Sequence, residues 1–177
     1  RRDVVDIDVL PLQQCIDTQL RLKTEYARAT GTDVCYNNGK TCLKASKNWR
    51  TFLHNWMHSK GVGSYNDKIK EGKWKRDIEV IPRKNWDSII PGDVMLTGGH
   101  AIAVKEIVEV PPGSGNKYYR TFAGSLPEVN ARVYNELRRV EEIKSAGVVN
   151  IYRWKTKGTP KKEEDIKDPY PFATTGS

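Results

Sequence analysis

Apolar residues recur at helical spacing in two early segments of the chain. Over residues 14–29 they form a continuous stripe, and Gly31 follows as a helix stop signal. A second stripe covers residues 47–59, with Ser46 as the expected N-cap and Gly61 just beyond the end. The pattern therefore predicts two N-terminal helices.

The remaining apolar residues come in short runs or alternate with polar ones, as in β-strands. Alternation of apolar and acidic residues over 3–10 predicts a half-buried strand, and further strands are predicted over 94–96, 100–104, 117–122, 131–134 and 148–154. Residues 136–144 fit a short helix or a polar loop. The lysine-rich residues 62–81 are typical of a surface connection. Helices first and strands second favour an α+β fold with an antiparallel sheet.

Length and charge limit the classes of protein that fit. The 177 residues suit a single domain over residues 1–155, followed by a polar tail over 156–177. No run of apolar residues is long enough to span a membrane. The net charge of +8 favours an anionic partner, whether nucleic acid, an anionic membrane surface or an anionic envelope polymer.

The chain has three cysteines. Cys35 and Cys42 flank a turn-forming loop that could bring them together as a disulfide, and two free thiols are the alternative. A disulfide would indicate an oxidising compartment and would leave Cys15 unpaired. No metal site is expected: CxxC pairs are absent, and His54 and His58 lack the glutamate of a zinc-peptidase motif.

Residues 89–104 combine a turn, a strand, a hairpin and a second strand. The Gly98-Gly99 pair favours a tight hairpin, after which His100 begins a strand on the same face as Ile102 and Val104. A histidine behind two glycines has open space in front of it, which suits a proton-transfer group. A partly exposed histidine with no chemical role is the alternative.

Cys15 is the candidate nucleophile. If the helix begins near residue 14, the thiol lies in the first turn, where free backbone N–H groups and the helix dipole stabilise a thiolate. The same N–H groups, with the Gln13 amide, could bind the oxyanion formed when a carbonyl is attacked, and His100 would be the base. If Pro11 opens the helix instead, Cys15 lies deeper and a structural role is equally compatible.

The order of these motifs resembles the NlpC-type papain-like cysteine hydrolases. The resemblance rests on Cys15 at the head of the first long helix, the later Pro-Gly-Asp-Val strand and the Gly-Gly-His strand, and it spans about residues 10–127. Leu12-Gln13-Gln14-Cys15, Arg21-Leu22-Lys23-Thr24-Glu25-Tyr26 and Ile90-Pro91-Gly92-Asp93-Val94 also resemble an uncharacterised bacterial envelope family beside that group. The resemblance implies N-terminal helices packed on a small antiparallel sheet or half-barrel. It also implies a periplasmic or secreted thiol hydrolase that cuts amide bonds of peptidoglycan peptides through Cys15 and His100, without a cofactor.

The family places a His, Asn or Gln at a third catalytic position, where this chain offers Ala123-Gly124-Ser125. Antiparallel pairing about Gly113 sets residues 124–128 opposite His100, so Ser125 or Glu128 is expected to orient the imidazole. Otherwise the Cys15–His100 dyad acts alone.

Two other functions fit the same residues. A catalytically inactive relative would bind an envelope polymer through the same cleft. A basic nucleic-acid-binding module would use residues 68–76, in which lysines and Arg76 surround Trp74.

Overall fold

The computed structural model describes residues 15–59, 61–123 and 134–165. Within these ranges the chain is an α+β domain, because helices pack on a six-stranded sheet in which every pairing is antiparallel. This confirms the fold class that the sequence predicts. The expected strand over residues 3–10 lies outside the described ranges.

The first two helices lie where the apolar stripes predict them. Helix α1 (Cys15–Thr30) buries Ile16, Leu20 and Ala27 completely, and Gly31 ends it with a positive φ of 72°. Helix α2 covers Trp49–Ser59. Its cap differs from the expected Ser46, because the Asn48 side chain accepts the N–H groups of Arg50 and Thr51.

The sheet order is β3-β8-β4-β5-β6-β7. The strands are β3 (Ile78–Ile81), β4 (Val94–Leu96), β5 (Ala101–Glu109), β6 (Lys117–Ala123), β7 (Tyr134–Arg139) and β8 (Asn150–Trp154). A separate hairpin pairs β1 (Cys35–Tyr36) with β2 (Thr41–Cys42). Helix α3 (Val62–Lys70) follows α2, and α4 (Val140–Ser145) connects β7 to β8.

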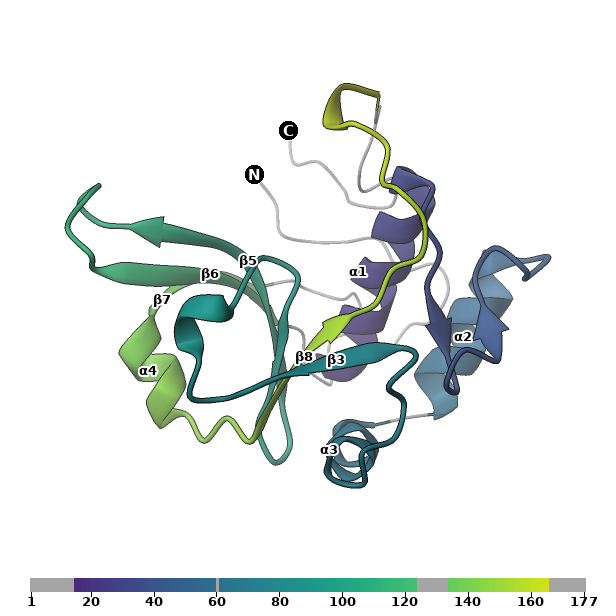
Figure 1. The fold of residues 1–177 in the computed structure, drawn as a ribbon, viewed down its shortest axis with the longest axis horizontal. Coiled ribbons are helices and arrows are strands. Elements are labelled where there is room, and N and C mark those ends of the chain that lie inside the picture. Colours follow the sequence, from purple (N-terminus) through teal and green to yellow (C-terminus); the bar gives the residue numbers. More distant parts are fainter. Residues whose placement is uncertain (1–14, 60, 124–133, 166–177) are drawn as a thin grey trace.

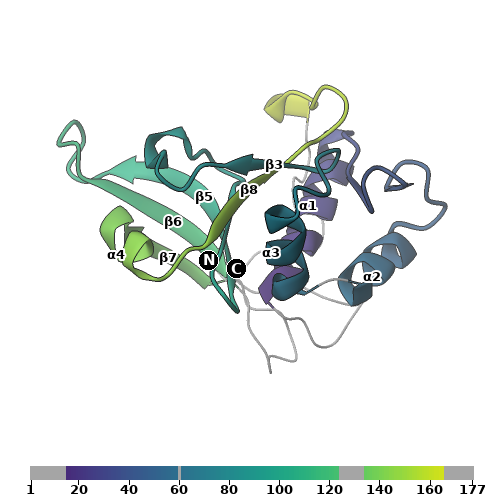
Figure 2. The same ribbon diagram turned by 60° about the horizontal axis from the view of Figure 1, so that its bottom comes forward.

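Helices cover both faces of the curved sheet, α1 to α3 on one and α4 on the other (Figures 1 and 2). Each face has its own hydrophobic core. On β5 the small side chains Ala101 and Ala103 face the core of α1, whereas Ile102 and Val104 face the core of α4. The two alanines leave room for α1 to approach the sheet closely, which places the start of α1 beside the start of β5.

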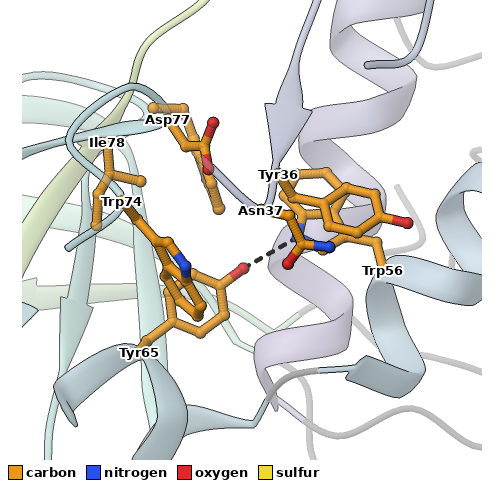
Figure 3. A pocket seen from close by; sticks show the side chains of 8 residues that line it. Tyr36, Asn37, Trp56, Tyr65, Trp74, Asp77 and Ile78 are labelled. Carbon is orange, nitrogen blue, oxygen red and sulfur yellow. Dashed lines mark hydrogen bonds between the residues drawn. The ribbon is translucent and has the colours of Figure 1, made fainter. Parts of the chain in front are cut away.

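An aromatic cluster joins the helices to the disulfide hairpin. The Trp56 indole N–H donates to the Tyr65 hydroxyl at 3.1 Å, and Tyr36 stacks on Trp56 with ring centroids 5.6 Å apart. Figure 3 shows these rings converging from α2, α3 and β1. The cluster also includes Trp154 of β8, so it connects the helical layer to the sheet.

The predicted disulfide is confirmed. Cys35 and Cys42 are bonded at 2.06 Å and close the β1–β2 hairpin. The Asp77 carboxylate accepts the backbone N–H groups of Asn38 and Gly39, at 2.6 and 2.8 Å. The hairpin is therefore attached to the loop that leads into β3.

Two segments differ from the sequence expectation. Residues 62–81, expected as a surface connection, contain α3 and β3, because Val62 and Tyr65 bury one short helical face against the aromatic cluster. Residues 134–139, expected partly as loop or helix, form β7, an edge strand with no apolar alternation. Helix α4 then occupies residues 140–145.

The chain after β8 returns to the end of α1. Asp33 and Lys157 exchange two backbone hydrogen bonds, and the Lys161 N–H donates to the Thr30 carbonyl at 2.9 Å. Residues just beyond the expected boundary at 155 thus contact the domain. In the described part of the chain, none of the helices has the length and apolar character needed to cross a bilayer.

Candidate functional site

Cys15 is the first described residue of α1 and is only 8% exposed. Its sulfur lies 4.0 Å from the carbonyl oxygen of Gly99, and it accepts a hydrogen bond from the backbone N–H of Ala101. The backbone on either side of His100 therefore contacts the sulfur. The structure brings the start of the first helix and the histidine hairpin together, as the two motifs require.

Opposing effects act on the Cys15 thiol. Burial raises its pKa above the usual value, and the nearby Asp17 carboxylate raises it further. Hydrogen bonds from the N–H groups of Ala101, Ile16 and Cys15 itself lower the pKa, but burial is the larger effect. The resting thiol is therefore protonated at neutral pH. The same three N–H groups surround the place where negative charge would develop on the sulfur.

A hydrogen-bond network fixes the turn that carries His100. The Thr97 N–H donates to the His100 carbonyl at 2.9 Å, and the His100 N–H donates to the Thr97 hydroxyl at 3.0 Å. The Asn66 amide of α3 donates to the Thr97 carbonyl, and Asn150 of β8 donates to Asn66. Side chains from α3 and β8 thus help to hold the turn in one conformation.

Sequence reasoning missed this network. Thr97 carried a weak signal in the sequence, because a threonine hydroxyl in a turn can accept a hydrogen bond from a backbone N–H group about two residues later. Asn66 and Asn150 had none, since their meeting depends on how α3 sits against the sheet.

His100 follows the Gly98-Gly99 bend, immediately before β5, and is partly exposed. Burial lowers its pKa, and the positive charge of Arg138 on β7 lowers it further, so the imidazole is neutral at pH 7. The sequence places it on the face of Ile102 and Val104, which pack in the core of α4, whereas Ala101 shares the core of Cys15. Because His100 precedes the strand, strand alternation does not set the direction of its side chain.

The other predicted site residues, Gln13, Ser125 and Glu128, lie outside the described ranges. The pairing of β5 with β6, which precedes Ser125 and Glu128 in the chain, is described. Ala103 pairs with Phe122, and a bulge between Val104 and Glu106 shifts the register by one residue nearer the hairpin tip. The sequence alone does not predict this bulge, so pairing counted from Gly113 gives only an approximate partner for His100.

Tyr152 is a further polar group near Cys15 that sequence reasoning did not identify. It is fully buried on β8, and among the described residues no group hydrogen-bonds its hydroxyl. Burial raises its pKa well above the usual value, and the charges of Tyr65 and Cys15 raise it further. The hydroxyl therefore stays protonated and can act only as a neutral donor or acceptor.

Two other groups of residues that could have formed a site, one for a metal and one for nucleic acid, have structural roles. Asp33 lies near Cys35 and Cys42, but both sulfurs are in the disulfide and the carboxylate accepts the N–H groups of Val34 and Lys44. Trp74, the expected stacking residue of a nucleic-acid module, packs edge-on against Tyr65 with centroids 5.1 Å apart (Figure 3). Its ring therefore anchors a loop to the core.

Comparison with known proteins finds no matching family model, no similar curated protein and no similar solved structure.

Proposed function

We propose that this domain is a papain-like cysteine hydrolase that cleaves amide bonds in bacterial cell-wall peptides. The observation that supports it is the position of the Cys15 sulfur, which sits at the first turn of α1 against the two backbone groups that flank His100. Thiol acyl transfer needs an imidazole within reach of the thiol, and the contact between the sulfur and the backbone of this turn supports that pairing.

In the proposed reaction, both groups begin neutral. His100 takes the Cys15 proton as the sulfur attacks the carbonyl carbon, and helix N–H groups bind the resulting oxyanion. The imidazolium then gives its proton to the leaving amine, and the C–N bond breaks to leave a thioester on Cys15. Water, deprotonated by His100, attacks the thioester and releases the carboxylic acid and the free thiol.

The substrate class and the location rest on other features. The Cys35–Cys42 disulfide is consistent with an oxidising compartment such as the periplasm or the extracellular space. The net charge of +8 favours retention on an anionic wall polymer. The steps above require no cofactor.

The test is hydrolysis of purified peptidoglycan fragments by the disulfide-intact chain, with new amines and carboxylates identified by mass spectrometry. We expect Cys15→Ala and His100→Asn each to lower the rate by at least about a hundredfold, since each removes a reacting group. His54→Asn, which changes an exposed histidine on α2, is the matched control and keeps full activity. Hydrolysis that survives in Cys15→Ala would refute the proposal.

One observation favours a second candidate, a catalytically inactive domain that binds the same polymer. Burial keeps the Cys15 thiol protonated, and the charge acting on His100 is the repulsive one of Arg138. This candidate predicts that the wild-type chain and Cys15→Ala bind insoluble peptidoglycan equally well in a sedimentation assay, with no product released by either.

A further inference from the structure

A pocket of about 400 Å³ lies between α1, the turn before β4, β5 and the chain that follows β8. Its volume is in the range of small-molecule sites. Leu22, Tyr26, Pro91, Val94 and Trp154 supply much of an apolar lining. The described residues that line it include three cations, Lys23, Lys105 and Arg153, and no carboxylate.

Two of these cations, Lys23 and Arg153, differ in their partners. Arg153 is neutralised by the Asp93 carboxylate at 2.7 Å. The Lys23 amine lies 5.2 Å from the centre of the Tyr26 ring, and among the described residues no carboxylate forms a salt bridge with it. Burial lowers its pKa to about 8. An ammonium group in such a place is costly unless an anion joins it.

The apolar wall includes Trp154, whose side chain is 7% exposed. A cation beside such walls complements an anion that carries an apolar body.

We propose that this pocket binds a small organic carboxylate, with its apolar part against the lining and its carboxylate paired with Lys23. Lys23 is two turns along α1 from Cys15, about 12 Å along the helix axis. A ligand there leaves the sulfur free, so the proposal does not depend on the proposed hydrolase activity.

The first test compares two probes of equal shape, 3-phenylpropionate and 3-phenylpropionamide, by isothermal titration calorimetry at pH 7. We expect the carboxylate to bind at least about tenfold more tightly than the amide, since only the carboxylate pairs with the ammonium. Lys23→Met, which keeps the length of the side chain, should abolish this difference. Lys84→Met, an exposed lysine away from the pocket, is the matched control and should preserve it.

The second test uses the wild-type chain alone. A bound carboxylate favours the protonated amine, so affinity should be constant between about pH 6 and pH 7, where both the probe carboxylate and Lys23 are charged, and should fall by about tenfold per pH unit above pH 8. Equal binding of acid and amide, equal behaviour of Lys23→Met and Lys84→Met, or an affinity independent of pH would each overturn the proposal.

Discussion

Burial controls the reactivity of Cys15 more strongly than its place at the helix start. The N–H groups of Ala101, Ile16 and Cys15 favour the thiolate, yet burial and Asp17 favour the thiol, and burial is the largest effect. A raised pKa means that the thiolate fraction is small at pH 7 and grows only as the medium becomes alkaline. Catalysis through Cys15 would therefore need His100 to remove the proton during the attack.

This predicts the pH dependence of alkylation. With the disulfide intact, iodoacetamide should label Cys15 slowly at pH 7, and the rate should still rise about tenfold per pH unit between pH 8 and pH 9. Labelling is followed by mass spectrometry, and the urea-unfolded chain is the control, with an ordinary thiol pKa of about 8.5. A rate that levels off below pH 8 would indicate a thiolate–imidazolium pair and contradict the neutral resting state.

Lys23 leads to a second prediction at this scale. Its pKa is lowered to about 8 in the folded chain, so the buried ammonium costs stability below pH 8, and this cost is relieved as the pH rises from 8 to 10.5. Lys23→Met should therefore be more stable than the wild type at pH 7, and its advantage should shrink by about 2 kcal/mol by pH 10. Urea unfolding at both pH values measures this. A constant difference, like that expected of Lys84→Met, would contradict it.

Among the elements, those with long one-sided stripes were predictable from the sequence and those with short ones were not. Helix α1 buries Ile16, Leu20 and Ala27 along one face, and its described part, Cys15–Thr30, overlaps the predicted range of 14–29. Helix α3 places Val62, Tyr65 and the partly buried Ile69 against the core, a helical spacing that is easily missed in a short, mostly polar segment. Among the described strands β7 pairs only with β6, and such an edge position places little demand for apolar alternation on its sequence.

The disulfide hairpin is the element whose contribution to stability is easiest to isolate. The bridge closes a loop with a sequence separation of 7 residues, and replacing both cysteines in Cys35→Ala/Cys42→Ala should lower the free energy of unfolding by about 2.5 kcal/mol through loop entropy. The hairpin is also stabilised by Tyr36, whose ring packs on Trp56.

Urea unfolding with and without a reductant separates the effect of losing the disulfide from the effect of replacing the two cysteine side chains. The reductant should destabilise the wild type and Cys15→Ser equally, because Cys15 is the free thiol. It should leave the double variant unchanged. A reductant effect of less than about 0.5 kcal/mol on the wild type would contradict this and show that the Asp77 hydrogen bonds and the Tyr36–Trp56 contact hold the hairpin without the bridge.

At the scale of the whole molecule, the sheet is completed by residues far apart in the chain. Strand β8 inserts between β3 and β4, so the first and last sheet strands of the described chain are neighbours. Periodicity shows which residues form strands, but it does not show which strands pair, because pairing depends on the packing of whole elements. The α+β class was therefore predictable, whereas the strand order and the Asn66–Asn150 contact at the site were not.

Contacts between residues far apart in the chain also help to define where the domain ends. The sequence places the boundary at residue 155, where composition becomes polar, but composition does not report backbone pairing. Asp33 and Lys157 exchange two hydrogen bonds, Lys161 donates one to Thr30, and Pro160 forms part of the pocket wall. Residues 156–161 thus tie the end of β8 to the end of α1.

Two shortened chains test this tie, one ending at Asp165 and one ending at Lys155. The shorter chain loses three backbone hydrogen bonds, each worth about 0.5–1.5 kcal/mol net, so its free energy of unfolding should be lower by about 2–4 kcal/mol. Its pocket also opens along one wall, so 3-phenylpropionate should bind more weakly than to the longer chain. Urea unfolding and calorimetry measure the two effects. If both chains unfold at the same urea concentration with the same slope, residues 156–165 add nothing to stability and the domain ends at residue 155.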